Sequence, residues 1–87
     1  MKELEKILKA LANHRRLSIL QFLKKNKEAS VGTIARAIKL SMKATSKHLT
    51  ILSAIDVVEK DQRSVSVFYR LAEKSPSCSQ IIISRFL

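Results

Sequence analysis

The feature that most restricts the fold of this chain is a connection of only three residues, 39–41, between two segments with helical periodicity. The first segment, residues 31–38, follows Ser30, and the second, residues 42–55, follows Ser41. Serine is a favoured N-cap residue because its hydroxyl accepts a hydrogen bond from a free backbone N–H at the start of a helix. Three residues allow only a sharp change of direction. Two short helices joined in this way form a helix-turn-helix.

Further helices are expected on both sides of this motif. Residues 2–12 carry an apolar stripe at helical spacing, and Asn13 then caps a second helix over residues 14–25. Ser75 is a suitable cap for a last helix up to the final residue, with Pro76 in its first helical position. The chain has one glycine and one proline, so its loops must be few and short. A mostly helical domain follows from this composition.

A β-hairpin is predicted between the helix-turn-helix and the last helix. Apolar and polar residues alternate over residues 65–71, which is the period-two pattern of a strand. Val57 and Val58 can supply the antiparallel partner, and the polar residues 60–64 can supply the turn. The predicted fold is therefore mostly α with a small β-hairpin. It is a winged helix-turn-helix in the order α-α-α-turn-α-β-β-α, in one domain over residues 1–87.

The helix over residues 42–55 has an unusual exposed face. Thr45, Leu49 and Leu52 form its core side, and the side chains that then point outward are short or basic. These are Lys43, Ala44, Ser46, Lys47 and Thr50. A helix in the major groove of DNA needs such a face, because small residues allow close approach, hydroxyls reach base edges, and lysines meet guanine or phosphate oxygens. The pattern therefore predicts a DNA-reading helix.

Other DNA contacts are expected beside this face. Ser41 lies at the start of the helix, and His48 lies on its flank, where it either contacts a phosphate or bonds to the backbone. Gln62 and Arg63 fall in the wing, residues 61–64. Arg63 is the best wing candidate for a phosphate or minor-groove contact, with a solvated loop position as an equal alternative.

The charge of the chain also points to a polyanionic partner. Lys and Arg total 17 against 7 Asp and Glu, a formal net charge of +10, and no acid lies between Glu28 and Asp56. Nucleic acid and an anionic membrane surface both fit such an excess. A membrane fits less well, because the basic residues lie on a helix-turn-helix and not opposite a long apolar stripe. Double-stranded DNA is the expected partner, and a basic surface that only favours solubility is the alternative.

Three motifs resemble one family. They are the run from Arg16 to Leu20 in "LANHRRLSILQFL", the stretch "LSMKATSKHLTIL" that begins at Leu40, and "VFYRL" at residues 67–71. All three are similar to the arsenical-resistance-repressor-like (ArsR-like) winged helix transcription regulators, and the likeness covers roughly residues 5 to 71. The resemblance implies a homodimer that binds operator DNA, usually as a repressor, with the first helix (2–12) and the last helix (76–87) at the dimer interface.

The chain departs from that family's pattern at two places. Many members carry a Cys-x-Cys metal site in the third helix, where this chain has Ser30 and Gly32, and the last helix lacks the His and carboxylate ligands of other metal-sensing members. No metal and no cofactor are therefore expected, and the effector is left open. Asp56 stands where the family usually has glycine, and aspartate tolerates the left-handed backbone better than most residues.

The predicted dimer interface is apolar. The last helix is too apolar for a helix that only touches a small core, so we expect it to pack with the first helix across a two-fold axis. The residues expected there are Leu4, Ile7, Leu11, Ile82 and Phe86. The two DNA-reading helices would then meet successive major grooves about 34 Å apart, and the operator would be an inverted repeat.

The predicted function is thus a DNA-binding transcription regulator, and the resemblance favours a repressor. The alternatives are a nonspecific, chromatin-like DNA-binding protein and a protein-interaction module in which Lys43 and Lys47 meet an acidic partner. Catalysis is not expected, because the acids are scattered and no glycine-rich phosphate loop exists. A single cysteine, Cys78, cannot form an internal disulfide, and no run approaches the roughly 18 apolar residues of a membrane span. A cytoplasmic location is expected.

Overall fold

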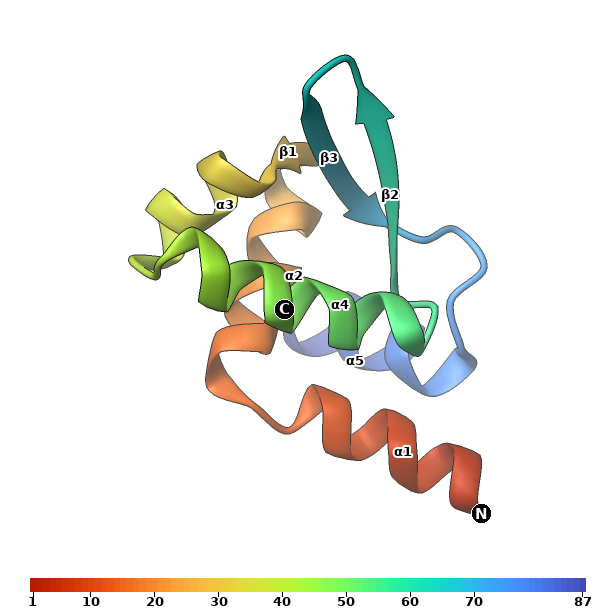
Figure 1. Ribbon diagram of the computed structural model, residues 1–87. Helices are drawn as coiled ribbons and strands as arrows, with labels where there is room; N and C mark the ends of the chain where they lie inside the picture. Colours follow the sequence, from red (N-terminus) through yellow and green to blue (C-terminus); the bar gives the residue numbers. More distant parts are fainter.

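The computed structural model describes all 87 residues and contains five helices and a three-stranded antiparallel sheet (Figure 1). The elements in chain order are α1 (Lys2–Leu11), α2 (His14–Asn26), β1 (Glu28–Ser30), α3 (Val31–Ile38), α4 (Met42–Ala54), β2 (Val58–Arg63), β3 (Ser66–Leu71) and α5 (Ser77–Phe86). The predicted winged helix-turn-helix is confirmed, with α3 and α4 as the helix-turn-helix and β2 and β3 as the wing.

Side-chain caps begin three helices where the sequence predicted them. Asn13, Ser30 and Ser41 each accept a hydrogen bond from the backbone N–H three residues further on, at 3.1, 3.2 and 3.1 Å. Lys39 ends α3 in the left-handed conformation, at φ 57° and ψ 51°. Asp56 follows α4 at φ 59°, so the left-handed position expected there is confirmed.

The start of the last helix was predicted wrongly. Pro76 is the N-cap of α5 and not its first helical residue, because its ψ of 144° is extended. The Pro76 carbonyl accepts the first helical hydrogen bond, from the Gln80 N–H at 3.1 Å, and a second bond from the Ser79 hydroxyl at 2.6 Å. Ser75 provides no side-chain cap; it is buried, and its carbonyl accepts a bond from the Gln80 side chain at 2.6 Å.

The sheet has one strand more than predicted, and its turn lies further along the chain. The order is β1-β3-β2, with Ala29 of β1 opposite Tyr69 of β3. A strand of three residues is too short to show alternation, so no pattern in the sequence indicated β1. β2 continues through Arg63, and the turn is therefore at Ser64 and Val65, not at residues 60–64.

The core lies between the helices and one face of the sheet. Leu20 of α2 and Leu49 and Leu52 of α4 have no exposed surface, so the predicted core side of α4 is confirmed. In Figure 1, α4 crosses in front of α2 and α5, the wing projects upward from the helices, and α1 lies below α4. This packing leaves one long side of α4 free at the surface.

Candidate nucleic-acid interface

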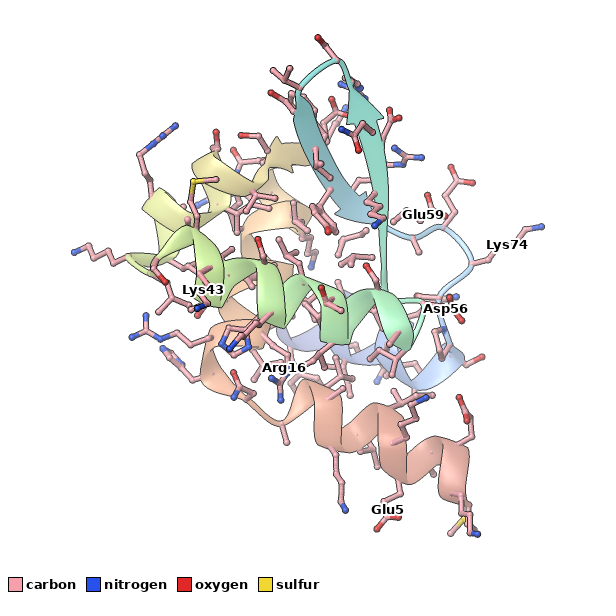
Figure 2. The ribbon with its side chains drawn as sticks, viewed as in Figure 1. Glu5, Arg16, Lys43, Asp56, Glu59 and Lys74 are labelled. Carbon is pink, nitrogen blue, oxygen red and sulfur yellow. The ribbon has the colours of Figure 1, made fainter.

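The free side of α4 consists of the residues that the sequence placed there. Lys43, Ser46, Lys47 and Thr50 are exposed, as is Ser41 just before the helix, and Ala44 is half-buried. Figure 2 shows Lys43 near the N-terminal end of α4, with Asp56 at its other end and Glu59 above the helix. The sequence of α4 contains no acid, and no ion pair within the chain involves either lysine. Both ammonium groups are available to a partner.

Arg63, which the sequence placed at the hairpin tip as a candidate for a DNA contact or a solvated position, does not lie in the turn. It lies in β2, and its guanidinium donates two hydrogen bonds to the Glu28 carboxylate, at 2.7 and 2.9 Å, and one to Asp61, at 2.9 Å. The same group lies over the Phe68 ring, 4.7 Å from its centroid. The hydrogen bond to Arg63 lowers the pKa of the Glu28 carboxyl, and the bonds to these carboxylates raise the pKa of Arg63. Gln62, also in β2, donates to a backbone carbonyl of the turn at 3.4 Å.

The wing as a whole therefore offers little free positive charge. Arg63 pairs with two acids, and Arg70 of β3 pairs with Glu59 at 3.2 Å. Lys60 is the cation of the wing that has no carboxylate partner. The sequence showed these charges but not their pairing, because Glu28 is 35 residues from Arg63. The available positive surface is on the helices.

His48 is held by a contact that sequence analysis missed. Its Nδ1 lies 3.1 Å from Nη1 of Arg16, whose Nε donates to the Ala10 carbonyl at the end of α1. Burial lowers the pKa of His48, and the charges of Arg16 and Arg15 lower it further. Arg15 itself donates to the Ile38 carbonyl at 2.9 Å. No local pattern could reveal the Arg16–His48 contact, because its partners are 32 positions apart.

Two residues of the predicted dimer interface belong instead to the core of the protomer. Ile7 and Leu11 are only 5% and 3% exposed, because α1 turns them toward α2 and α4. Ile82 is half-buried and also packs against this core. The protomer itself therefore already covers most of the surface of Ile7 and Leu11 and leaves little of it for the predicted dimer contact.

Exposed apolar side chains lie on α1 and α5, and Met42, Ile51 and Val65 are exposed elsewhere on the chain. Leu4 is 40% exposed and Phe86 75%, as a dimer surface requires, and Leu8 (44%) and Ile81 (54%) are also exposed although they were not predicted. The signal for them was present, since Leu8 belongs to the same α1 stripe as Leu4.

The structure also bears on metal and membrane sites. No group of three or more His, Cys, Asp or Glu side chains lies close enough to hold a metal ion. At the family's usual metal positions, Ser30 uses its hydroxyl to cap α3, and Gly32 has no side chain to offer. No helix combines the length and the apolar character that crossing a bilayer requires.

Known proteins are similar to this chain in sequence and in fold. A family model described as "Helix-turn-helix domain" matches residues 7–61. The transcriptional activator HlyU of Vibrio cholerae serotype O1 is 42% identical over 66 residues, which are 76% of this chain and 60% of HlyU. The chain thus spans about 60% of the length of this curated relative.

Solved structures of related regulators have the same fold as this chain. A structure of HlyU from Vibrio cholerae aligns with a TM-score of 0.81 at 36% identity, over 95% of this chain and 86% of that one. Mb0332 from Mycobacterium bovis, a homodimeric winged helix-turn-helix DNA-binding domain, aligns with a TM-score of 0.78 at 33% identity, over 84% of this chain and 67% of that one. The transcriptional repressor BigR from Xylella fastidiosa aligns with a TM-score of 0.78 at 28% identity, over 98% of this chain and 84% of that one. The chain belongs to the ArsR-like family of winged helix-turn-helix transcription regulators.

Proposed function

We propose that this chain is a DNA-binding transcription regulator that binds an inverted-repeat operator as a homodimer. In this proposal α4 enters the major groove, and the wing lies against the neighbouring DNA backbone. The observation that carries it is the exposed face of α4, which has no acid and whose two lysines, Lys43 and Lys47, have no ion pair in the chain. Phosphates are the natural partners of such a face.

The homodimer is supported by the exposed apolar side chains of α1 and α5. Leu4, Leu8, Ile81 and Phe86 would otherwise remain in water, and a second copy of the chain covers them in the proposed assembly. Mb0332, one of the similar structures, is homodimeric. A two-fold axis through this surface would present two α4 helices to DNA, which is the reason for expecting an inverted repeat.

The direction of regulation does not follow from the fold, because HlyU is an activator and BigR a repressor. We propose repression for this chain. A dimer that occupies an operator excludes the polymerase without any additional contact, whereas activation requires a further surface that contacts another protein.

The test is fluorescence anisotropy with duplex DNA over a series of salt concentrations. The double variant Lys43→Ala/Lys47→Ala is compared with the parent, and Lys2→Ala/Lys74→Ala is the matched control. The control removes the same charge from exposed positions away from α4, and Figure 2 shows how far Lys74 lies from Lys43. If both α4 lysines reach phosphates, the slope of log K against log salt falls by about 1.8, since each phosphate contact contributes about 0.9.

The alternatives give different outcomes. A chromatin-like protein would bind shuffled competitor DNA as tightly as any selected sequence. A protein-interaction module would show no measurable DNA binding even at low salt. Equal salt slopes for the two double variants would remove α4 from the interface and so contradict the proposal.

A further inference from the structure

His48 and Arg16 meet where three helices converge. Arg16 lies in α2, and Figure 2 shows it between α4 and α1. Its Nε donates to the Ala10 carbonyl of α1, and its Nη1 is 3.1 Å from Nδ1 of His48 in α4. Both side chains are partly buried, and none of the chain's ion pairs includes Arg16. The guanidinium is therefore fixed from one side by a backbone carbonyl and from the other by the imidazole.

This contact determines which imidazole nitrogen carries the hydrogen. A guanidinium has five N–H donors and no acceptor, so His48 Nδ1 must accept the bond and cannot itself be protonated. A neutral imidazole has its hydrogen on the other nitrogen in that case, here Nε2. Burial and the charges of Arg16 and Arg15 disfavour the doubly protonated ring, which agrees with this assignment.

The Nε2–H group has no partner within the chain. No hydrogen bond of the chain involves Nε2, and the fully buried unpartnered side-chain atoms are Thr45 Oγ1 and Ser53 Oγ alone, so Nε2 retains some exposed surface. His48 follows the exposed Lys47 and occupies the flank of α4, between its core side and its free side. A helix that lies in the major groove turns its flanks toward the groove walls, which are lined by phosphates.

We propose that Arg16 is a positioning residue for DNA binding: its guanidinium fixes His48 in the Nε2–H tautomer, and that N–H donates a hydrogen bond to a DNA phosphate. This inference rests on the proposed function. It assigns the two residues different roles, since His48 touches the phosphate and Arg16 acts through His48.

The two amide substitutions at position 48 separate the two ring nitrogens. His48→Gln places an amide nitrogen near the position of Nε2 and keeps a donor there, whereas His48→Asn keeps an amide only near Nδ1. Loss of a hydrogen bond to a charged phosphate weakens binding by about tenfold. We therefore expect His48→Asn to lose about tenfold in DNA affinity and His48→Gln to remain within about threefold of the parent.

The salt dependence provides a second readout. A neutral donor displaces no counterion, so both variants should keep the parent's slope of log K against log salt, whereas Lys47→Ala should lower it by about 0.9. A slope that falls in His48→Asn as it does in Lys47→Ala would show that His48 binds as a cation, and would overturn the inference.

The role of Arg16 is tested by a double-mutant cycle. Arg16→Lys keeps the charge but cannot bond both the Ala10 carbonyl and His48 in the same fork geometry. We expect it to reduce affinity several-fold in the parent and to have no effect in the His48→Asn background. An equal loss in both backgrounds would mean that Arg16 acts by its own charge, and would overturn its role as a positioning residue.

An experiment without DNA reads the tautomer directly. The nitrogen chemical shifts of the two imidazoles, His14 and His48, are measured by NMR on the free protein near pH 7.5. His14 has no hydrogen bond from its ring and serves as the internal reference. His48 should show the Nε2–H form alone, and a populated Nδ1–H form would overturn the inference even if Arg16→Lys failed to fold. Absence of DNA binding by the parent protein would instead remove the proposed function, and the phosphate contact with it.

Discussion

Thr45 has a buried hydroxyl on the core side of α4. The residue has no exposed surface, and its Oγ1 has no hydrogen-bond partner. An unpaired buried hydroxyl costs about 1–3 kcal/mol, whereas the methyl group of valine fills similar space without that cost. We expect Thr45→Val to raise the free energy of unfolding by about 1 kcal/mol in urea denaturation.

The matched control for this prediction is Thr50→Val. Thr50 is exposed on the same helix, and its hydroxyl donates to the Ser46 carbonyl at 2.9 Å. Its substitution should change the free energy of unfolding by no more than about 0.5 kcal/mol. A loss of stability in Thr45→Val would contradict the unpaired state of its hydroxyl.

His48 makes stability depend on pH within a defined window. Its pKa is lowered from 6.5 in the folded protein, so the unfolded chain binds a proton more readily than the folded chain does. The contribution of neutral His48 to the free energy of unfolding is fully present above about pH 6.5 and is lost as the pH falls below that value. We expect the free energy of unfolding to decrease between about pH 7.5 and pH 5.5 and this part of the decrease to disappear in His48→Gln.

Glu28 affects the stability of the fold in a different pH range from His48. Glu28 has a pKa lowered from 4.5 by its hydrogen bond to Arg63, so its contribution to stability is present above that value and is lost as the pH falls below it. Denaturation experiments above about pH 5 therefore report on His48 without interference from Glu28. A loss of stability between pH 7.5 and 5.5 that persists in His48→Gln would assign it to another group.

At the scale of the elements, the pairing of Arg63 with Glu28 joins the wing to β1. Glu28→Gln removes one of the two carboxylates that pair with the guanidinium, so that Asp61 alone remains and Arg63 is more available to a phosphate. We expect tighter DNA binding in anisotropy measurements and a salt slope steeper by up to about 0.9. Glu59→Gln is the matched control, because it removes the same charge from the wing but frees Arg70 instead. Identical effects of the two variants would show that only the overall charge matters.

The two serine caps distinguish helix stability from DNA contact. Ser30 and Ser41 make the same capping bond, at the starts of α3 and α4. Each serine-to-alanine change should lower the free energy of unfolding by about 1 kcal/mol. Ser41→Ala alone should also weaken DNA binding at concentrations where both variants are folded, because Ser41 lies beside the free side of α4. Equal DNA affinities for the two variants would remove Ser41 from the interface.

At the scale of the whole molecule, the prediction is the oligomeric state. Phe86→Glu places a charge in the apolar surface of α1 and α5, where Phe86 is 75% exposed and contributes little to the protomer's own core. We expect the parent to sediment as a dimer at micromolar concentration and Phe86→Glu to sediment as a folded monomer with weaker operator binding. Val65→Glu is the control for sedimentation only, since Val65 is 94% exposed at the tip of the wing, away from α1 and α5. A monomeric parent would contradict the proposed assembly.

Short-range patterns were sufficient for much of this molecule. The helix-turn-helix, its serine caps, the core side of α4 and the order of helices and hairpin strands depend on interactions between residues a few positions apart. Periodicity and capping express those interactions directly in the sequence. The exposed lysines of α4 follow from the same reasoning, because the core side of a helix determines its opposite side.

The sequence by itself therefore determined the fold class and the face of α4, which arise from local spacing and composition, and its motifs carried the resemblance to a known family. Only the tertiary structure decided which charged side chains pair with one another and which apolar side chains are buried. Arg63 is neutralised by Glu28, and His48 is held by Arg16, across separations of 35 and 32 residues. Ile7 and Leu11 enter the core while Leu4 stays exposed, although all three belong to one stripe. Such outcomes depend on how elements pack against one another, and the spacing within a single element cannot express them.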